Sequence, residues 1–261
     1  MADGHGPSLK GKTALIAGAS RNLGKTIALA FAAAGAENLI LVASKSFDEL
    51  KQVADECEQL GANALPLQAD LSRPDEASAV VRQGLEHYGY IHILVVVAGI
   101  RPHKSFSEIE VGDWIPCFAA NLDPTFYLAK AMAPTMIAKR LGGSIVTLGG
   151  VSSLTAQPNR MQVITTKTAL YGLTKSLALE LGPYGVRANH VALGAVGTDR
   201  RNPEWYKHEG GDPGTAAVIA QSPLGRLGTQ REATDVVLFL ASDQSSYITG
   251  DRIVCAGGRY M

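Results

Sequence analysis

The sequence predicts an α/β fold in which a single domain is built on a doubly wound, seven-stranded parallel sheet. Short apolar runs alternate with longer segments of helical period along the chain, which is typical of consecutive β-α-β units. The strands are almost continuously apolar, as at Ile93–Val97, and such strands are covered by helices on both faces. A chain of 261 residues that is 46% hydrophobic is long enough to bury one large core.

Seven strands and six helices are expected in alternation. The expected strands are Thr13–Ala17, Leu39–Val42, Ala64–Gln68, Ile93–Val97, Ser144–Leu148, Arg187–Ala192 and Arg252–Val254. The expected helices are Lys25–Ala34, Asp48–Leu60, Asp75–Tyr88, Gly112–Lys139, Val163–Leu181 and Arg231–Leu240. Proline lacks a backbone donor, so Pro124 predicts a local break inside the fourth helix.

Composition excludes several classes of function. The 24 basic residues balance 24 acidic ones, and a chain without net charge or a basic run is not expected to bind nucleic acid. The longest apolar stretch, Ile91–Ile100, is about half of the ~20 residues that cross a bilayer, and residues 1–10 lack an apolar signal core. Three cysteines far apart indicate neither a disulfide framework nor a metal site. We therefore expect a cytoplasmic protein with no membrane partner and no metal.

One segment, 198–227, breaks the regular alternation and is too long for an ordinary connection. It follows a strand at the expected carboxyl edge of the sheet, where a substrate lid is expected. Trp205, Tyr206 and His208 within it would form an aromatic wall over a substrate. The alternative is a variable surface loop.

A glycine-rich turn follows the first strand and opens a helix. Dinucleotide phosphates require this order, because free amides at a helix start bind anions. The loop residues expected to touch a cofactor are Gly18, Ser20, Arg21, Asn22, Leu23 and Gly24. Gly18 allows the tight turn and Gly24 allows close helix packing. Asn22 stands where such loops usually carry glycine, and asparagine tolerates a left-handed backbone better than most residues.

Residues after the second strand favour NADP(H) over NAD(H). No acid stands at positions 43–45, where a carboxylate would bind the adenosine ribose of NAD. Ser44 and Lys45, together with Arg21, offer a hydroxyl and two cations to a 2′-phosphate. Solvated surface charge is the alternative interpretation.

The ends of the next two strands complete the expected cofactor site. Asp70, followed by Leu71, comes just after the third strand and is a candidate to meet the adenine amino group. Ala98 and Gly99 follow the fourth strand and leave room for the ring.

From about Leu9 to Gly258 the chain resembles the short-chain dehydrogenase/reductase family. The landmarks that carry the resemblance stand in family order: Gly18–Gly24, Asp70-Leu71, Val97-Ala98-Gly99, Asn121, Gly172–Leu181, Val186–Asn189, Ile248-Thr249-Gly250 and Gly257-Gly258. The resemblance implies a Rossmann-like fold and a small-molecule substrate. It also implies a homotetramer or homodimer whose interface uses the two long helices.

The resemblance further implies roles for five residues. Lys167 would bind the nicotinamide ribose, and Asn121 would hold a water that links to that lysine. Gly194, Val196 and Thr198 resemble the segment whose valine amide and threonine hydroxyl hold the nicotinamide carboxamide.

Two family hydroxyls are absent. The family tyrosine lies four residues before the lysine and the serine about thirteen before the tyrosine, so their positions hold Val163 and Gly150. The tyrosine normally donates the carbonyl proton, and general acid catalysis contributes about 10²- to 10⁴-fold in rate. Either another group substitutes for it, or the reaction differs.

Several nearby residues are candidates to substitute. Ser152 or Ser153 would supply the hydroxyl if the loop after the fifth strand brings one of them into the serine position. Gln162 would donate an amide hydrogen bond, and His103 would protonate a substrate near neutral pH. A buried Lys167 with a lowered pKa would itself pass a proton. The alternatives are turn serines, a helix amide and a polar loop histidine without a catalytic role.

We expect an NADP(H)-dependent oxidoreductase that acts on a small carbonyl, hydroxyl or imine compound with a non-standard active site. Reduction of a protonated imine would depend least on a proton donor, because the imine already carries the charge that such a donor would induce. Two alternatives keep the scaffold: a non-redox lyase, isomerase or cyclase, and a pseudoenzyme that binds the cofactor without turnover.

Overall fold

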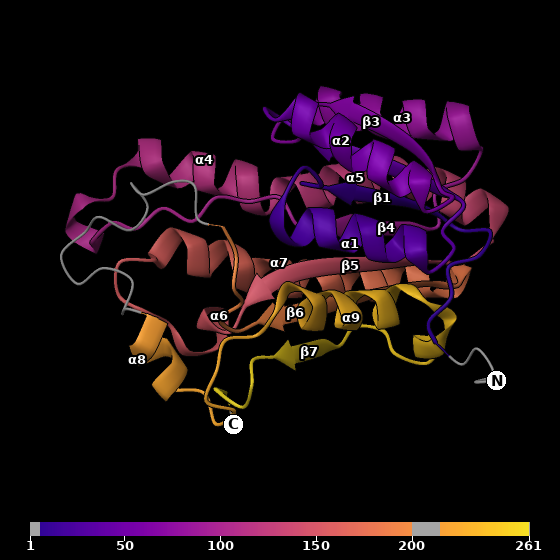
Figure 1. Cartoon of the computed structure of the whole chain (residues 1–261). Helices are drawn as coiled ribbons and strands as arrows, with labels where there is room; N and C mark the ends of the chain where they lie inside the picture. Colours follow the sequence, from indigo (N-terminus) through magenta and orange to yellow (C-terminus); the bar gives the residue numbers. More distant parts are fainter. Residues whose placement is uncertain (1–5, 200–214, 261) are drawn as a thin grey trace.

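Seven strands pair in parallel in one sheet, in the order β3-β2-β1-β4-β5-β6-β7 (Figure 1), within residues 6–199 and 215–260, which the computed structural model describes. The strands are β1 Thr13–Ala17, β2 Asn38–Ala43, β3 Asn63–Gln68, β4 Ile93–Val96, β5 Gly143–Gly150, β6 Val186–Leu193 and β7 Arg252–Cys255. Every expected strand is present, with ends that differ by at most two residues. The strand order reverses between β1 and β4, the point where doubly wound sheets bind their ligands.

Helices cover both faces of the sheet. They are α1 Asn22–Ala33, α2 Phe47–Gln59, α3 Pro74–Tyr88, α4 Val111–Asn121, α5 Asp123–Lys139, α6 Ser152–Thr155, α7 Met161–Leu181, α8 Thr215–Ala220 and α9 Gln230–Ala241. Short 3-10 helices at Phe106–Glu108, Gly182–Tyr184 and Asp243–Ser245 join them. Every expected helical range contains a helix, and the short helices α6 and α8 were not expected.

Two hydrophobic cores lie on opposite sides of the sheet. Successive strand residues point to opposite faces, so Ala14 and Ile16 belong to one core while Leu15 and Ala17 belong to the other. Residues of α1, α2 and α9 close the first core, and residues of α3, α5 and α7 close the second. The continuous apolar strands are explained by this burial on both faces.

The break that Pro124 predicts in the fourth expected helix is present, and it divides that range into two helices. The range Gly112–Lys139 contains two helices, α4 and α5, with Leu122 between them at φ −113° and ψ −54°. Pro124 lies in the first turn of α5, where its missing backbone donor removes no helical hydrogen bond. Asn121 is consequently the last residue of α4, not a residue inside a long helix.

The carboxyl edge of the sheet faces α4, α6 and α8. In Figure 1 the arrowheads of β5 and β7 point toward this side. The expected lid at 198–227 follows β6 here, but Trp205, Tyr206 and His208 lie outside the described residues. The described part of the segment contains α8.

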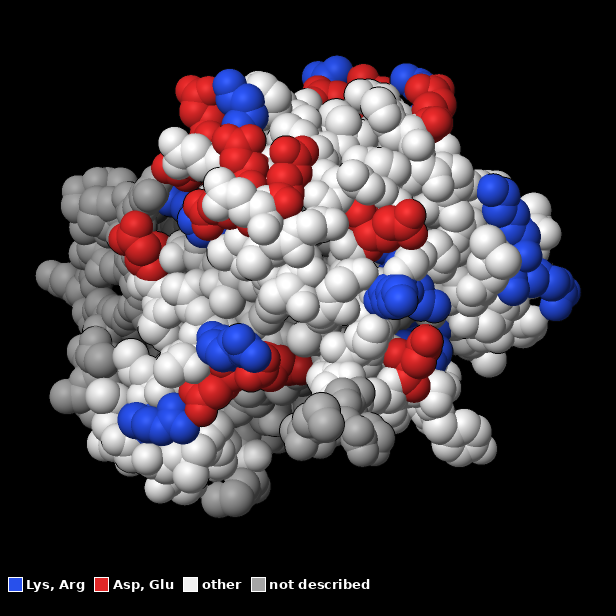
Figure 2. Space-filling model, turned by 45° about the vertical axis from the view of Figure 1, so that its right-hand side comes forward, with Lys and Arg blue, Asp and Glu red and all other residues white. Residues whose placement is uncertain are grey.

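The described surface carries both signs of charge. Figure 2 shows blue and red side chains distributed over a mostly white face. Among the helices of residues 6–199 and 215–260, none combines the length and apolar character that a membrane span requires.

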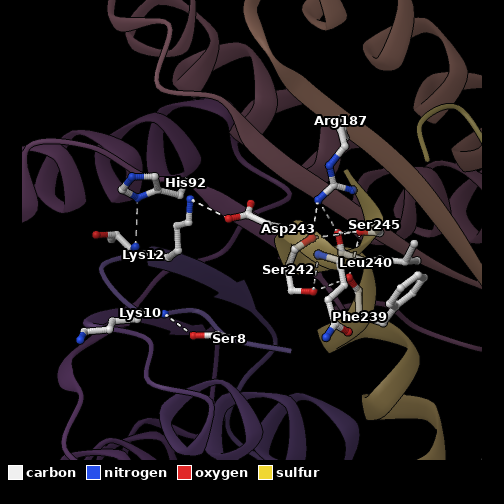
Figure 3. A network of polar contacts seen from close by, with 12 residues as sticks. Ser8, Lys10, Lys12, His92, Arg187, Phe239, Leu240, Ser242, Asp243 and Ser245 are labelled. Carbon is white, nitrogen blue, oxygen red and sulfur yellow. Dashed lines mark hydrogen bonds and ion pairs between the residues drawn. The ribbon is translucent and has the colours of Figure 1, made fainter. Parts of the chain in front are cut away.

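Arg187 binds the end of α9 at the amino edge of the sheet (Figure 3). Its Nη2 donates hydrogen bonds to Leu240 O at 2.9 Å and to Ser242 O at 3.0 Å. The last carbonyls of a helix lack helical partners and carry partial negative charge, so a guanidinium satisfies and stabilises them. This contact joins β6 to α9.

His92 joins β4 to β1 in the same region (Figure 3). Its Nδ1 accepts a hydrogen bond from Thr13 N at 3.1 Å, and Lys12 forms an ion pair with Asp243 at 3.8 Å. Burial, assisted by the positive charge of Lys12, lowers the pKa of His92 to about 4. The imidazole therefore stays neutral at pH 7 and accepts the backbone hydrogen bond.

Replacing Arg187 should destabilise the fold. We expect Arg187→Met to lower the free energy of unfolding by about 2 kcal/mol, because it removes charged donors from partly buried carbonyls. Urea denaturation at fixed protein concentration measures the change. Arg82→Met, which removes an exposed arginine 3.9 Å from Glu86, should cost less than about 0.5 kcal/mol. Equal costs for the two variants would contradict this role of Arg187.

Candidate active site

The glycine loop has the close packing that its sequence predicts. Gly18 has φ +90°, and a β-carbon there would lie 2.8 Å from Ala98 N. A β-carbon on Gly24 would overlap the carbonyl oxygen of Gly18. Helix α1 begins at Asn22, three residues before the expected start, so the loop leads directly into the first turn. The free amides of that turn form the kind of site that binds a phosphate.

Asn22 adopts the left-handed backbone that its position requires, with φ +47°. Its side chain also makes a contact that the sequence did not predict. Asn22 Nδ2 donates to Asp199 O at 3.0 Å, and Asp199 N donates to Asn22 Oδ1 at 2.9 Å. The amide thus pairs with the backbone of the segment that follows β6.

The residues expected to bind the adenosine half of the cofactor are exposed or only partly buried. Arg21, Ser44 and Lys45 are exposed at the carboxyl edges of β1 and β2, and Ser20 is partly buried in the same turn. Their exposure leaves them accessible to an anionic group, but no contact between them fixes a phosphate position.

The turn after β3 is ordered by its aspartate. Asp70 Oδ1 accepts hydrogen bonds from Ser72 N at 3.1 Å and Ser72 Oγ at 2.7 Å, while Leu71 is buried. One Asp70 oxygen therefore stabilises the turn, which is a structural role in addition to the expected adenine contact.

Lys167 and Asn121 meet beside Gly99 at the end of β4. A β-carbon on Gly99 would lie 2.7 Å from Asn121 Oδ1 and 3.5 Å from Lys167 Nζ. Lys167 Nζ donates to Leu148 O in β5 at 3.0 Å. The glycine allows the helix residues to approach the strand end, so the expected pair is brought together.

The side chain of Asn121 holds the backbone after β4. Its Oδ1 accepts from Ile100 N at 2.7 Å, and its Nδ2 lies 3.0 Å from Ile100 O and 3.2 Å from Thr166 Oγ1. The side-chain amide of Asn121 is therefore hydrogen-bonded to other protein groups. The expected water would be held by other atoms of this residue. The sequence predicted the residue but not this backbone contact.

The ammonium group of Lys167 is unusually easy to deprotonate. Burial, assisted by the positive charge of Arg101, lowers the pKa of Lys167 to about 8. A pKa near the working pH suits a group that gives and takes a proton. Arg101 therefore acts on the electrostatics of the site from the loop after Gly99.

The structure distinguishes the two candidate serines. A β-carbon on Gly150 would lie 3.5 Å from Ser152 Oγ, so this hydroxyl lies beside the family serine position. Ser153 Oγ instead donates to Gly150 O at 2.7 Å and stabilises the turn. Val163, which stands at the expected tyrosine position, is buried, and its side chain has no proton to donate.

Gln162 and His103 are both buried, but neither is brought to Lys167 by a described contact. Gln162 is one helical turn before Thr166, on a different face from Val163, which is one turn before Lys167. Among residues 6–199 and 215–260, neither polar atom of the Gln162 side chain has a hydrogen-bond partner. His103 is 8% exposed. Their catalytic roles stay predictions.

The segment after β6 is held against neighbouring loops. Gly194 N donates to Cys255 O at 2.9 Å, and a β-carbon on Gly194 would lie 2.7 Å from Ala256 Cα. Val196 forms a parallel bridge with Gly228. Thr198, which follows, is partly buried. The order of these residues is compatible with the expected carboxamide contact.

The sequence did not indicate a role for His190, a buried histidine of β6. His190 Nδ1 is 2.8 Å from Thr147 Oγ1, and a β-carbon on Gly149 would overlap the imidazole ring. Burial, followed by the charges of Lys167 and Arg252, lowers the pKa of His190 to about 3.

The packing of the glycine loop is testable. We expect Gly24→Ala to lower the free energy of unfolding by about 2–3 kcal/mol, because the new methyl group overlaps the Gly18 carbonyl. Chemical denaturation measures the loss. Gly182→Ala should change stability by less than about 1 kcal/mol, since Gly182 has φ −52° and open space around it. A Gly24→Ala protein as stable as the Gly182→Ala control would contradict this packing.

Comparison with known proteins gives matches along nearly the whole chain. The family described as enoyl-(acyl carrier protein) reductase matches residues 18–259. The chain is 34% identical to the 3-oxoacyl-(acyl-carrier-protein) reductase FabG of Salmonella typhimurium, over 97% of this chain and 99% of that protein. It is 32% identical to the L-rhamnose 1-dehydrogenase (NAD(P)(+)) of a Sphingomonas species, over 97% and 98% of the two chains.

Solved structures agree with these matches. A putative short-chain alcohol dehydrogenase from Sinorhizobium meliloti superposes with a TM-score of 0.89 at 30% identity, covering 97% of each chain. A short-chain type dehydrogenase/reductase from Mycobacterium marinum gives a TM-score of 0.87 at 35% identity, covering 97% of this chain and 96% of that one. The matched length includes the glycine loop, Asn121 and Lys167.

Proposed function

Because the chain belongs to the short-chain dehydrogenase/reductase family, we propose that it is an NADP(H)-dependent oxidoreductase acting on a small carbonyl or hydroxyl compound. The observation that carries the proposal is the meeting of Lys167, Asn121 and Gly99 at the strand-order reversal, next to the glycine loop. That edge of a doubly wound sheet is where ligands bind. Fold alone would not support a reaction, but this site does.

The residues present fit a dinucleotide. The tight Gly18 turn and the close Gly24 contact leave backbone amides free at the start of α1 for a pyrophosphate. Thr198 and Lys167 are available to the carboxamide and the ribose of the nicotinamide half. When bound, the reduced cofactor supplies the hydride that reduces a carbonyl carbon.

The charges beside β2 support NADP(H). Arg21 and Lys45 are exposed with Ser44 at the edge that would receive the adenosine ribose, and no acid replaces them. A 2′-phosphate gains charged hydrogen bonds there, while the ribose hydroxyls of NAD lack their usual carboxylate partner.

Lys167 is the group best suited to replace the missing tyrosine as the acid. When hydride reaches a carbonyl carbon, the oxygen gains the electron pair of the C=O π bond and needs a proton. The Lys167 ammonium, with a pKa of about 8, gives that proton and is recharged from solvent. Ser152, beside Gly150, would donate a hydrogen bond to the same oxygen. In the oxidative direction the neutral amine takes the hydroxyl proton.

The same charges favour a carbonyl over an iminium substrate. Arg101 already lowers the pKa of Lys167, which means that the two positive charges interact. A third positive charge on a protonated imine would be repelled, whereas a developing alkoxide would be stabilised. We therefore assign carbonyl compounds as the substrate class.

Self-association is part of the proposal. Large apolar side chains are exposed on the segment that leads from the Phe106–Glu108 turn through α4 into α5, including Phe106, Val111, Ile115 and Phe126. An apolar surface of this kind is typical of an interface. It supports a homodimer or homotetramer in which α4, α5 and α7 face a partner.

Cofactor preference is the first test. Fluorescence titration of the wild-type protein should give a Kd for NADPH at least tenfold lower than that for NADH. The double variant Arg21→Ala/Lys45→Ala should remove most of this preference, because each charged contact to a phosphate contributes about 1.5–3 kcal/mol. Lys139→Ala, at the far end of α5, is the control and should leave both Kd values unchanged. If the protein bound neither NADPH nor NADH, the redox proposal would be wrong and a non-redox reaction would be favoured.

The role of Lys167 predicts a pH profile. With 2,3-butanedione and saturating NADPH, the rate of reduction should fall as pH rises through about 8, because only the ammonium form donates a proton. Lys167→Arg keeps a charge but cannot release it, so the rate should drop by about 10²-fold or more and the fall near pH 8 should disappear. Lys175→Arg, on the exposed side of α7, should retain the wild-type profile. An unchanged profile in Lys167→Arg would show that another group is the acid.

A further inference from the structure

The backbone around Thr198 is held on both sides. Before it, Gly197 N donates to Gly228 O at 3.0 Å. After it, the backbone of Asp199 exchanges two hydrogen bonds with the Asn22 side chain, at 2.9 Å and 3.0 Å. Within the part of the chain that the structure describes, the Thr198 hydroxyl itself makes no hydrogen bond. The residue is fixed while its hydroxyl stays available to a ligand.

Asn22 is the residue that makes the second attachment possible. Its φ of +47° is comfortable for glycine, but glycine has no side chain to reach Asp199. Asparagine is among the few other residues that adopt this backbone readily, and its amide has both a donor and an acceptor. One side chain therefore satisfies the turn and pairs with both backbone groups of Asp199.

The loop that carries Asn22 is itself anchored. Thr26 Oγ1 lies 3.0 Å from Asn22 O and 3.0 Å from Gln230 Oε1 at the start of α9. Gln230 is two residues from Gly228, the partner of Gly197. The two attachments of the Thr198 segment thus belong to one connected group of loops, so the position of Thr198 relative to the phosphate-binding turn is set in advance.

We infer that Asn22 is a positioning residue, whose amide ties the phosphate-binding loop to Asp199 and so holds Thr198 in place for the nicotinamide half of the dinucleotide. The inference rests on the proposed cofactor site. A segment that is ordered before binding loses less entropy when the ligand arrives, which raises affinity. Only a ligand that contacts Thr198 binds more tightly because this segment is already ordered. A fragment that ends at the adenosine phosphates does not.

The test compares two ligands in one variant. Asn22→Gly removes both hydrogen bonds but keeps a residue suited to positive φ, so the loop backbone is not strained. By calorimetric titration, Asn22→Gly should raise the Kd for NADPH about tenfold, because the segment that the two hydrogen bonds had ordered must then be ordered when the ligand binds. The Kd for 2′,5′-ADP, which lacks the nicotinamide half, should change less than twofold. A purely structural effect on the loop would weaken both ligands together.

Asn63→Gly is the matched control. This variant also removes two side-chain hydrogen bonds, from Asn63 Nδ2 to Glu37 O at 3.2 Å and to Asn38 Oδ1 at 3.0 Å, but at the amino edge of the sheet. It should bind both ligands like the wild type. An unchanged Kd for NADPH in Asn22→Gly, or equal weakening of both ligands, would overturn the inference while the proposed function stands. A wild-type protein that binds neither ligand would overturn the proposed function first, and this inference with it.

Discussion

The amide of Asn121 joins three parts of the fold at one point. Its two ends hold both backbone groups of Ile100, just after β4, and it also contacts Thr166 in α7. The end of α4, the exit of the central strand and the helix that carries Lys167 are therefore fixed relative to one another. Since buried polar groups must be paired, a shift of any one element would leave an amide or a backbone group without a partner. The geometry of the site depends on this contact more than on any single charged pair.

The polar side chains at the two edges of the sheet have different roles. At the amino edge, Arg187 donates a hydrogen bond to a backbone carbonyl and His92 accepts one from a backbone amide. These contacts stabilise the fold. At the carboxyl edge, burial and the positive charge of Arg101 lower the pKa of Lys167. Like charges at a buried site cost free energy, and such a cost is typical of sites where chemistry uses the charge.

Most of the fold was predictable because it depends on local pattern. Apolar strands and helical periods identify each β-α-β unit without knowledge of its neighbours, and the sequence placed all seven strands. Within Gly112–Lys139, Pro124 was a local signal for the break, but the sequence did not show that the break separates two helices or that Asn121 would end the first one beside the strand end.

The site was predictable only in part. Lys167 and Asn121 were recognisable from their spacing to other landmarks. The pairing of Asn22 with Asp199 and the burial of His190 depend on residues far apart in sequence, and no local pattern reports such contacts. The choice between Ser152 and Ser153 depends instead on how the turn after Gly150 is folded, which the residue types alone do not decide. The influence of Arg101 on Lys167 likewise arises from proximity in space.

The space around position 150 differs from the space around position 163. A β-carbon on Gly150 meets nothing closer than 3.5 Å, which is ordinary van der Waals contact, whereas Val163 lies in a buried position where a phenol ring needs added room. The β-carbon of a serine at position 150 would therefore meet no clash, whereas a tyrosine at position 163 would require its surroundings to repack.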